Sequence, residues 1–281
     1  MIPAAFDYER ATSVEEAVAL LARGGDDAKL LAGGHSLLPL MRLRLARPTL
    51  LIDIGRLDDL RFIRGDEESV EIGALTTHHD LADSHELAEA CPLLVQTASQ
   101  IGDPQVRHRG TIGGSVAHGD PASDMPAALL ALDADLVLEG PDGSRTVAAA
   151  AFFDGPLMTA LGADEILAVI RVPRRARRTA YLKFQRRAQD WAIVGVAAAV
   201  RIEDGRIEEA EIGLTNMGPT PLRAAAVEAA LVGASDAAAV SAAAHEVGAI
   251  GTPPGDENAT PGFRLHIAEV MIRRAVGAAM A

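Results

Sequence analysis

The chain has 281 residues, of which 49% are hydrophobic, 23% charged and 3% aromatic, a composition typical of a soluble globular protein with one large domain or two medium ones. Its 39 acidic and 26 basic side chains leave a net charge of −13, which disfavours nucleic acid as a partner because phosphate binding needs positive surface. The single cysteine, Cys91, excludes a disulfide framework, a four-thiolate zinc site and an iron–sulfur cluster held by this chain alone, so any redox cofactor must be organic.

The first part of the chain alternates short helices and strands. Residues 13–16, Ser-Val-Glu-Glu, form a capping box and predict a helix that ends at about Gly24. The next apolar run predicts a strand over 29–32 that continues into a turn at 33–36. Further predicted elements are a short helix over 37–45 that Pro39 interrupts, and strands over 50–54 and 70–73.

A helical pattern over 86–101 is expected to be divided by Pro92. The following stretch, 102–124, is so rich in glycine, proline and small polar residues that it predicts a long loop, and long loops in compact domains are usually functional. A hairpin over 135–148 and a strand over 165–172 complete this half, whose alternation of strands and helices indicates an α/β organisation.

The pattern changes after residue 174. Runs of strands are followed by runs of helices, which indicates a separate α+β unit. The strands are predicted over 181–186, 193–202 and 207–214, with a hairpin turn at 203–205, and the helices over 224–232, 236–250 and 263–279. We therefore predict an α+β protein with one domain over 1–175, subdivided at about 1–55 and 56–175, and a C-terminal domain of antiparallel strands and helices over 176–281.

Basic residues gather near this boundary in an otherwise acidic chain. The cluster could be a solvated linker, or it could be a docking edge for an acidic partner surface or for a phosphate. Its members are Arg171, Arg174, Arg175, Arg177, Arg178, Lys183, Arg186 and Arg187.

The sequence contains two Gly-Gly pairs, each followed within two residues by a serine. They lie in the segments 32–36 (Ala-Gly-Gly-His-Ser) and 111–115 (Thr-Ile-Gly-Gly-Ser). Glycine has no Cβ, so such a backbone can approach a ligand closely and point N–H groups at anionic oxygens. Either pair alone could be a simple turn, but two such loops can clamp a pyrophosphate. The chain has neither a G-x-G-x-x-G fingerprint nor a P-loop. Hydroxyl donors would come from Ser36, Thr111 and Ser115, and Asp124 could accept from ribose or ribityl hydroxyls.

The segments 32–41 and 111–124 closely resemble the FAD-binding medium subunits of molybdenum hydroxylases, most of all those of the aerobic carbon monoxide dehydrogenase type. The resemblance covers the whole chain, because the segments 72–77, 103–107, 190–192 and 214–224 also match in order. It implies an FAD-binding fold of the vanillyl-alcohol-oxidase or PCMH type, made of two α/β subdomains and followed by a small C-terminal α+β domain.

By this resemblance the two glycine loops hold the pyrophosphate of FAD and Asp124 contacts its sugar or ribityl part. Leu167 matches a position near the flavin ring, and Lys183 and Trp191 lie where the family brings its second domain over the cofactor. Trp191 could cover a flavin face or anchor a core. Ile101 stands where related xanthine dehydrogenases have an aromatic residue, which puts a stacking contact there in question. The expected cofactor-binding residues are Ala32, Gly33, Gly34, His35, Ser36, Ile101, Thr111, Ile112, Gly113, Gly114, Ser115, Asp124, Leu167, Lys183 and Trp191.

His35 is expected to lie near the flavin. Berberine-bridge-type oxidases bond FAD covalently to the histidine of a similar Gly-Gly-His-Ser motif, but those chains are longer and carry their own substrate domain, so we expect non-covalent FAD here. The sequences His78-His79-Asp80 and His118-Gly119-Asp120 lack the spacing of a known metal site. We therefore assign no metal ligands, and we find no catalytic pair of side chains.

The family resemblance implies an electron-transfer role. A large subunit would oxidise the substrate at a molybdenum centre, the iron–sulfur clusters of a small subunit would carry the electrons, and FAD on this chain would pass them to an external acceptor. The expected assembly is a dimer of heterotrimers. The alternatives are a stand-alone flavin-dependent oxidoreductase of the same fold and a non-catalytic module that has kept the fold. The substrate is left open among carbon monoxide, an aldehyde, a purine and another N-heterocycle.

The first nine residues lack the basic-then-apolar layout of a signal peptide, and no stretch approaches the roughly 18 apolar residues of a membrane span. We therefore expect a cytoplasmic protein without a membrane span, whose complex could associate with the membrane through its electron acceptor.

Overall fold

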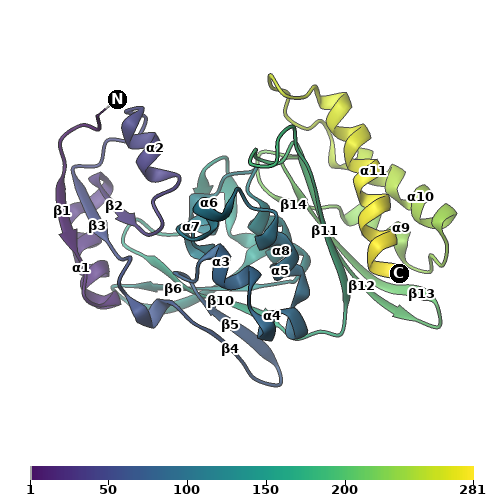
Figure 1. Cartoon of the computed structure of the whole chain (residues 1–281), viewed down its shortest axis with the longest axis horizontal. Helices are drawn as coiled ribbons and strands as arrows, with labels where there is room; N and C mark the ends of the chain where they lie inside the picture. Colours follow the sequence, from purple (N-terminus) through teal and green to yellow (C-terminus); the bar gives the residue numbers. More distant parts are fainter. Residues whose placement is uncertain (1) are drawn as a thin grey trace.

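The computed structural model describes residues 2–281, which form three regions in a row along the long axis of the molecule (Figure 1). The N-terminal region consists of β1 (Asp7–Arg10), α1 (Val14–Gly24), a 3-10 turn (Gly25–Asp27), β2 (Ala28–Leu31), α2 (Leu37–Arg42) and β3 (Leu50–Asp53). Its strands form a parallel sheet in the order β1-β3-β2. Helix α1 begins where the Ser13 hydroxyl accepts the N–H of Glu16, and it packs against β2 and β3.

The middle region is an antiparallel sheet with short helices on one side (Figure 1). The strands are β4 (Ile63–Gly65), β5 (Ser69–Gly73), β6 (Asp135–Gly140), β7 (Gly143–Ala148) and β10 (Ile166–Pro173), in the order β4-β5-β10-β6-β7. The helices are α3 (His78–Ala82), α4 (His85–Ala90), α5 (Pro92–Ser99), α6 (Pro104–Arg107), α7 (Ile112–His118) and α8 (Asp124–Ala131). 3-10 turns at Asp58–Leu60 and Ala149–Ala151 and a small hairpin of β8 (Phe153–Gly155) and β9 (Met158–Thr159) complete it.

The C-terminal region is a four-stranded antiparallel sheet that is covered on both faces. Its elements are β11 (Arg178–Phe184), β12 (Val194–Glu203), β13 (Arg206–Thr215), β14 (Leu222–Arg223), α9 (Ala225–Leu231), α10 (Ala237–His245), a 3-10 turn (Glu246–Ile250) and α11 (Pro261–Met280). Helices α9 and α11 pack on this sheet, and so do α5 and α8 from the middle region. Since both faces are covered, the run 194–200 of β12 is apolar and buried throughout.

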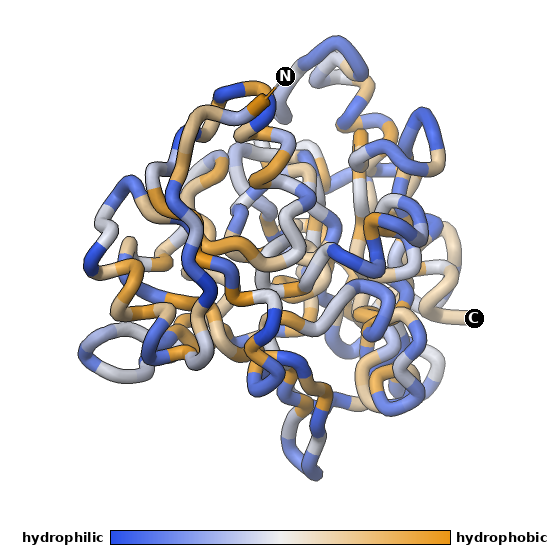
Figure 2. The backbone as a smooth tube through the Cα atoms, turned by 60° about the vertical axis from the view of Figure 1, so that its left-hand side comes forward, coloured by the Kyte–Doolittle hydropathy of each residue, from blue (hydrophilic) through white to orange (hydrophobic). Residues whose placement is uncertain are grey.

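Each region has its own hydrophobic core, and hydrophobic segments lie inside while hydrophilic turns lie outside (Figure 2). The core of the middle region also includes Tyr181 of β11 and Ala197 of β12, so the C-terminal sheet closes that core from one side. Within residues 2–281, no helix combines the length and the apolar character that a bilayer crossing requires.

Most of the predicted elements are present close to their expected bounds, including the division of the 86–101 helix at Pro92. The predicted long loop over 102–124 is wrong, because it contains α6, α7 and the first residue of α8. The polar residues that suggested a loop are helix caps: the Asp103 side chain accepts the N–H of Val106, and the Thr111 hydroxyl accepts the N–H of Gly114.

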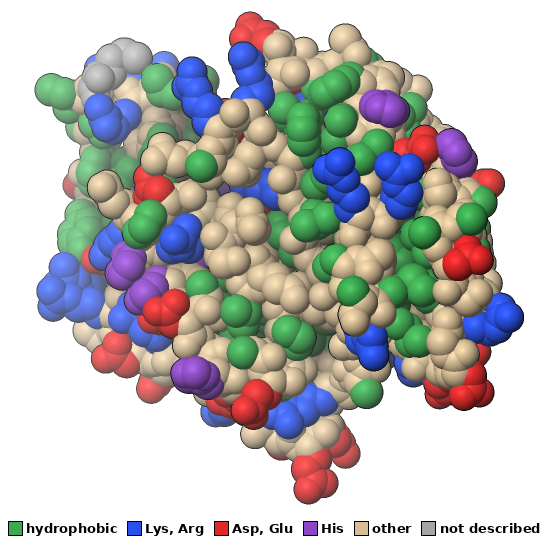
Figure 3. All heavy atoms as spheres, turned by 45° about the vertical axis from the view of Figure 1, so that its right-hand side comes forward, with side chains coloured by type: hydrophobic (Ala, Val, Ile, Leu, Met, Phe, Trp, Pro, Cys, Tyr) green, Lys and Arg blue, Asp and Glu red, His purple; other side chains and the backbone are tan. Residues whose placement is uncertain are grey.

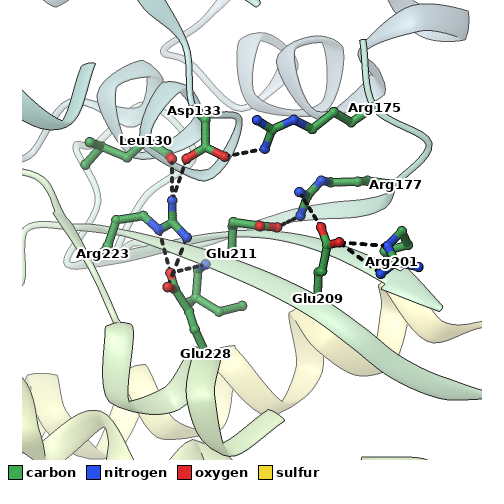
Figure 4. A network of polar contacts seen from close by, with 10 residues as sticks. Leu130, Asp133, Arg175, Arg177, Arg201, Glu209, Glu211, Arg223 and Glu228 are labelled. Atoms are coloured by element: carbon green, nitrogen blue, oxygen red, sulfur yellow. Dashed lines mark hydrogen bonds and ion pairs between the residues drawn. The ribbon is translucent and has the colours of Figure 1, made fainter. Parts of the chain in front are cut away.

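The basic cluster near residue 175 is mostly exposed, but several of its members form ion pairs within the chain, which neither the linker nor the docking interpretation anticipated. Arg177 is the most buried of the four arginines from 174 to 178, with 6% of its side chain exposed, and it pairs with Glu209 at 2.9 Å and with Glu211 on β13. Arg175 pairs with Asp133, which follows α8. Asp133 in turn accepts from Arg223 on β14 at 2.8 Å (Figure 4). These ion pairs join the middle region to the C-terminal sheet.

We expect Arg177→Leu to lower the free energy of unfolding by about 3 kcal/mol or more, because it leaves the buried carboxylate of Glu211 without its cation. The matched variant Arg175→Leu removes a half-exposed pair and should cost less than about 1 kcal/mol. Urea unfolding of both variants and of the unmodified chain measures the difference. If both variants lost the same free energy of unfolding, the buried ion pair would not be more important for stability than the half-exposed one.

Candidate functional site

The two glycine segments, 32–36 and 111–115, lie against each other although they come from different regions. A Cβ at Gly33 would lie 2.1 Å from the carbonyl oxygen of Arg109, in the backbone of residues 109–110 that leads into the second segment. A Cβ at Gly113 would lie 2.4 Å from the Cβ of Ala74. Neither position can accept a side chain, so the absence of Cβ is what allows the backbones to meet.

The two segments differ in the hydrogen-bond donors that they offer. In the second segment, the backbone N–H groups of residues 112–115 all donate to acceptors in the protein, at 2.9–3.2 Å. In the first segment, the N–H groups of residues 33–36 have no acceptor among residues 2–281. Gly34 adopts φ +74°, a conformation that favours glycine, between these groups. An anion could therefore accept hydrogen bonds from the free backbone N–H groups of the first segment. The second segment would contribute a backbone that the anion can approach closely.

A cavity of about 830 Å³ extends along both segments and reaches the C-terminal region. This volume is in the range of cofactor sites, roughly 300–1,000 Å³. All the expected cofactor-binding residues line the cavity except Ile112, whose side chain is fully buried in the core of the middle region. The sequence analysis did not assign several other lining residues, among them Lys29, His78, Met158 and Glu165.

Asp124 lies in the cavity wall at the start of α8 and is only 5% exposed. One carboxylate oxygen accepts from the Tyr181 hydroxyl and the other accepts from Lys183 Nζ at 2.8 Å. Lys183 Nζ also donates to the carbonyl oxygen of Gln100 at 3.2 Å. Burial raises the pKa of Asp124, and the Lys183 ammonium opposes this effect. Both oxygens of Asp124 are thus engaged by β11, so a sugar hydroxyl would have to use a remaining lone pair.

Trp191 lies at the rim of the cavity and is 73% exposed, so the alternative that it anchors a core is wrong. Leu157 and Met158 of the small hairpin also line the cavity and are exposed. Three exposed apolar side chains thus lie at the rim, while polar groups come from the glycine segments and from charged residues such as Asp124 and Lys183. On the face seen in Figure 3, basic and acidic side chains are interspersed rather than gathered in one field.

The histidines near the cavity have different environments. His35 Nδ1 lies 3.2 Å from the carbonyl oxygen of Gly33. His78 is 4% exposed, and burial, with the nearby charges of Arg107 and His35, lowers its pKa to about 4. His79 stacks on His108 with ring centroids 3.9 Å apart. No three His, Cys, Asp or Glu side chains between residues 2 and 281 gather as metal ligands.

Backbone at which a Cβ would clash, N–H groups without an acceptor in the chain and a cavity of cofactor size fit a protein that binds a dinucleotide. The family model described as FAD binding domain in molybdopterin dehydrogenase matches residues 4–175, and the model described as CO dehydrogenase flavoprotein C-terminal domain matches residues 179–279. The chain belongs to this family of FAD-binding oxidoreductase subunits.

The chain is similar to the carbon monoxide dehydrogenase medium chain of Hydrogenophaga pseudoflava, with 53% identity over 203 residues, which are 72% of this chain and 71% of that one. It is 44% identical to the medium chain of the same name from Afipia carboxidovorans over 284 residues, which cover 100% of this chain and 99% of that one. Among solved structures, carbon monoxide dehydrogenase from Hydrogenophaga pseudoflava matches with a TM-score of 0.96 and 49% identity, and covers 99% of this chain and 98% of that one.

Protonation of His78 should couple pH to stability. Its pKa is lowered from 6.5 to about 4, so as the pH falls through this range the unfolded chain takes up a proton that the folded chain does not. We expect His78 alone to reduce the free energy of unfolding by about 3 kcal/mol between neutral pH and pH 4, since each pKa unit corresponds to about 1.4 kcal/mol.

Urea unfolding at a series of pH values measures this effect. His78→Leu should flatten the pH dependence between pH 4 and 6.5, whereas His79→Leu, which changes an exposed neighbour on the same helix, should leave it unchanged. An unaltered slope in His78→Leu would show that other groups cause the acid destabilisation.

Proposed function

We propose that the chain is the FAD-carrying electron-transfer subunit of a molybdenum hydroxylase complex of the carbon monoxide dehydrogenase type. It accepts electrons from the iron–sulfur clusters of a small subunit and passes them to an external acceptor. The observation that carries the proposal is the cavity in which two glycine segments from different regions meet, in a chain similar over its whole length to medium chains of carbon monoxide dehydrogenase.

FAD is bound without a covalent link in this proposal. The free N–H groups of residues 33–36 hold the pyrophosphate, and residues 111–115 provide close approach and hydroxyl groups. When bound, FAD supplies the ability to accept electrons singly and release them in pairs. The proposed contact residues are Ala32, Gly33, Gly34, His35, Ser36, Ile101, Thr111, Ile112, Gly113, Gly114, Ser115, Asp124, Leu167, Lys183 and Trp191, of which Ile112 contributes its backbone.

The partners are a large subunit with the molybdenum centre and a small iron–sulfur subunit, assembled as a dimer of heterotrimers. A stand-alone flavin oxidoreductase would need an acid or base over the flavin. Two carboxylates of the cavity wall are already held by cations, Asp124 by Lys183 and Glu165 by Arg145, and His78 is a very weak base. His35, His118, Asp120 and Asp190 also line the cavity, so the similarity to medium chains over the whole length is what favours a relay. Glycine segments that still meet closely favour a cofactor-binding subunit over a module that has only kept the fold.

The division into domains at 1–175 and 176–281, with subdomains at about 1–55 and 56–175, belongs to the same proposal. The two matched ranges, 4–175 and 179–279, support the main boundary. We also propose a cytoplasmic location, with any membrane association made through the acceptor of the complex. Cell fractionation with an antibody against this chain tests the location.

Gentle purification of the tagged chain from its native host tests the assembly. We expect two further polypeptides to co-purify, together with FAD, iron and molybdenum, and we expect the complex to oxidise carbon monoxide. Recovery of the chain alone with FAD, and turnover of an organic substrate by it, would replace the relay by the stand-alone oxidoreductase. A complete complex that oxidises another substrate would support the electron-transfer role, but it would contradict the assignment to the carbon monoxide dehydrogenase type.

Gly114→Val tests the pyrophosphate clamp. A Cβ at this position would lie 2.8 Å from Thr111 Oγ1, so the valine pushes into the segment that must approach the cofactor. We expect the complex to assemble without FAD, as measured by flavin absorbance per complex. Gly262→Val is the matched control, because a Cβ there meets open space in α11. Normal flavin content in Gly114→Val would refute the clamp.

A further inference from the structure

His78 occupies the cavity wall between the two glycine segments. It is the first residue of α3, and its backbone N–H donates to the carbonyl oxygen of Gly110 at 3.0 Å. A Cβ at Gly110 would lie 3.0 Å from His78 Cδ2 and 3.4 Å from His78 Nε2, so one edge of the imidazole ring lies against the backbone that leads into the second segment. The ring of His78 is therefore packed against main chain along this edge.

The ring nitrogens of His78 lack the hydrogen bonds that buried polar groups normally have. Nδ1 is fully buried and has no partner, and among residues 2–281 no hydrogen bond of Nε2 is present either. A neutral imidazole carries its proton on one nitrogen. An orphaned buried N–H is rarer in proteins than an orphaned acceptor, so the proton belongs on Nε2. His78 then presents one uncharged N–H donor from a wall that lines the cavity.

We propose that His78 is a further cofactor-contacting residue, whose Nε2–H donates a hydrogen bond to an oxygen or nitrogen acceptor of the bound flavin dinucleotide. This inference rests on the proposed function. The donor lies against the backbone of Gly110, and it adds no charge to a site that already contains the Lys183 cation. His78 would thus contribute to the orientation of the dinucleotide beyond the two glycine segments.

The test uses the assembled complex, stripped of FAD and titrated with FAD. We expect His78→Leu to weaken FAD binding by about threefold to tenfold, the loss that one neutral hydrogen bond causes. His78→Gln, whose amide can donate to the same acceptor, should recover part of the affinity. His79→Leu should bind like the unmodified complex, because His79 does not line the cavity. Thermal unfolding of the FAD-free complexes shows whether each variant is folded.

Two results would overturn the inference while FAD binding by the unmodified complex stands: His78→Leu that binds FAD normally, or a folded His78→Gln that binds as weakly as His78→Leu. The second result would mean that ring packing, and not hydrogen bonding, matters at this position. If His78→Leu does not assemble, His78→Asn replaces it, since its amide is too short to reach the same acceptor. An unmodified complex that binds no FAD at all would overturn the proposed function, and this inference with it.

Discussion

The close backbone contact between the two glycine segments is the constraint on which the rest of the site depends. Gly33 meets the carbonyl group of Arg109, and Gly113 meets Ala74 after β5, at distances that no Cβ could tolerate. The wall of the cavity therefore includes main chain that side chains do not separate, and the N–H groups of residues 33–36 in it have no acceptor among residues 2–281. Any substitution that separates the segments would move the N-terminal region away from the middle region and open the cavity.

The second boundary of the cavity depends on a buried charge pair. Lys183 reaches from β11 to Asp124 on α8 and to the end of α5, and Tyr181 from the same strand donates to Asp124. A buried carboxylate is costly unless it is paired and hydrogen-bonded, so these contacts fix the C-terminal sheet to the two helices that it covers. Strand β11 also contributes Tyr181 to the core of the middle region. The packing of the C-terminal region and the formation of this cavity wall therefore depend on the same strand.

Local sequence signals correctly predicted those helix ends that depend on residues close in sequence. The Ser13 cap and the break at Pro92 depend on neighbouring residues, and both are present. The predicted capping box is only half formed, because the Glu16 carboxylate accepts from the N–H of Thr12 and not from that of Ser13. The stretch 102–124 was misjudged, because its polar residues cap short helices and Gly113 packs against Ala74, a contact that no local pattern reveals. Ile112 belongs to the second segment by sequence, but its helical position turns the side chain into the core. The buried ion pair of Arg177 was missed for the same reason, since Arg177 and Glu211 are distant in sequence.

An acidic chain that binds an anionic dinucleotide must create its attraction locally. In the cavity wall, Lys183 is paired with Asp124 and His78 carries no charge above about pH 4, so Lys29 is the cation without an ion pair in the described structure. The free N–H groups of residues 33–36 add oriented dipoles, which act over a few ångströms. The net charge of −13 belongs to the whole chain, and salt screens exposed charges beyond roughly 10 Å. Short-range attraction by one lysine and by backbone N–H groups can therefore favour an anionic ligand in so acidic a protein.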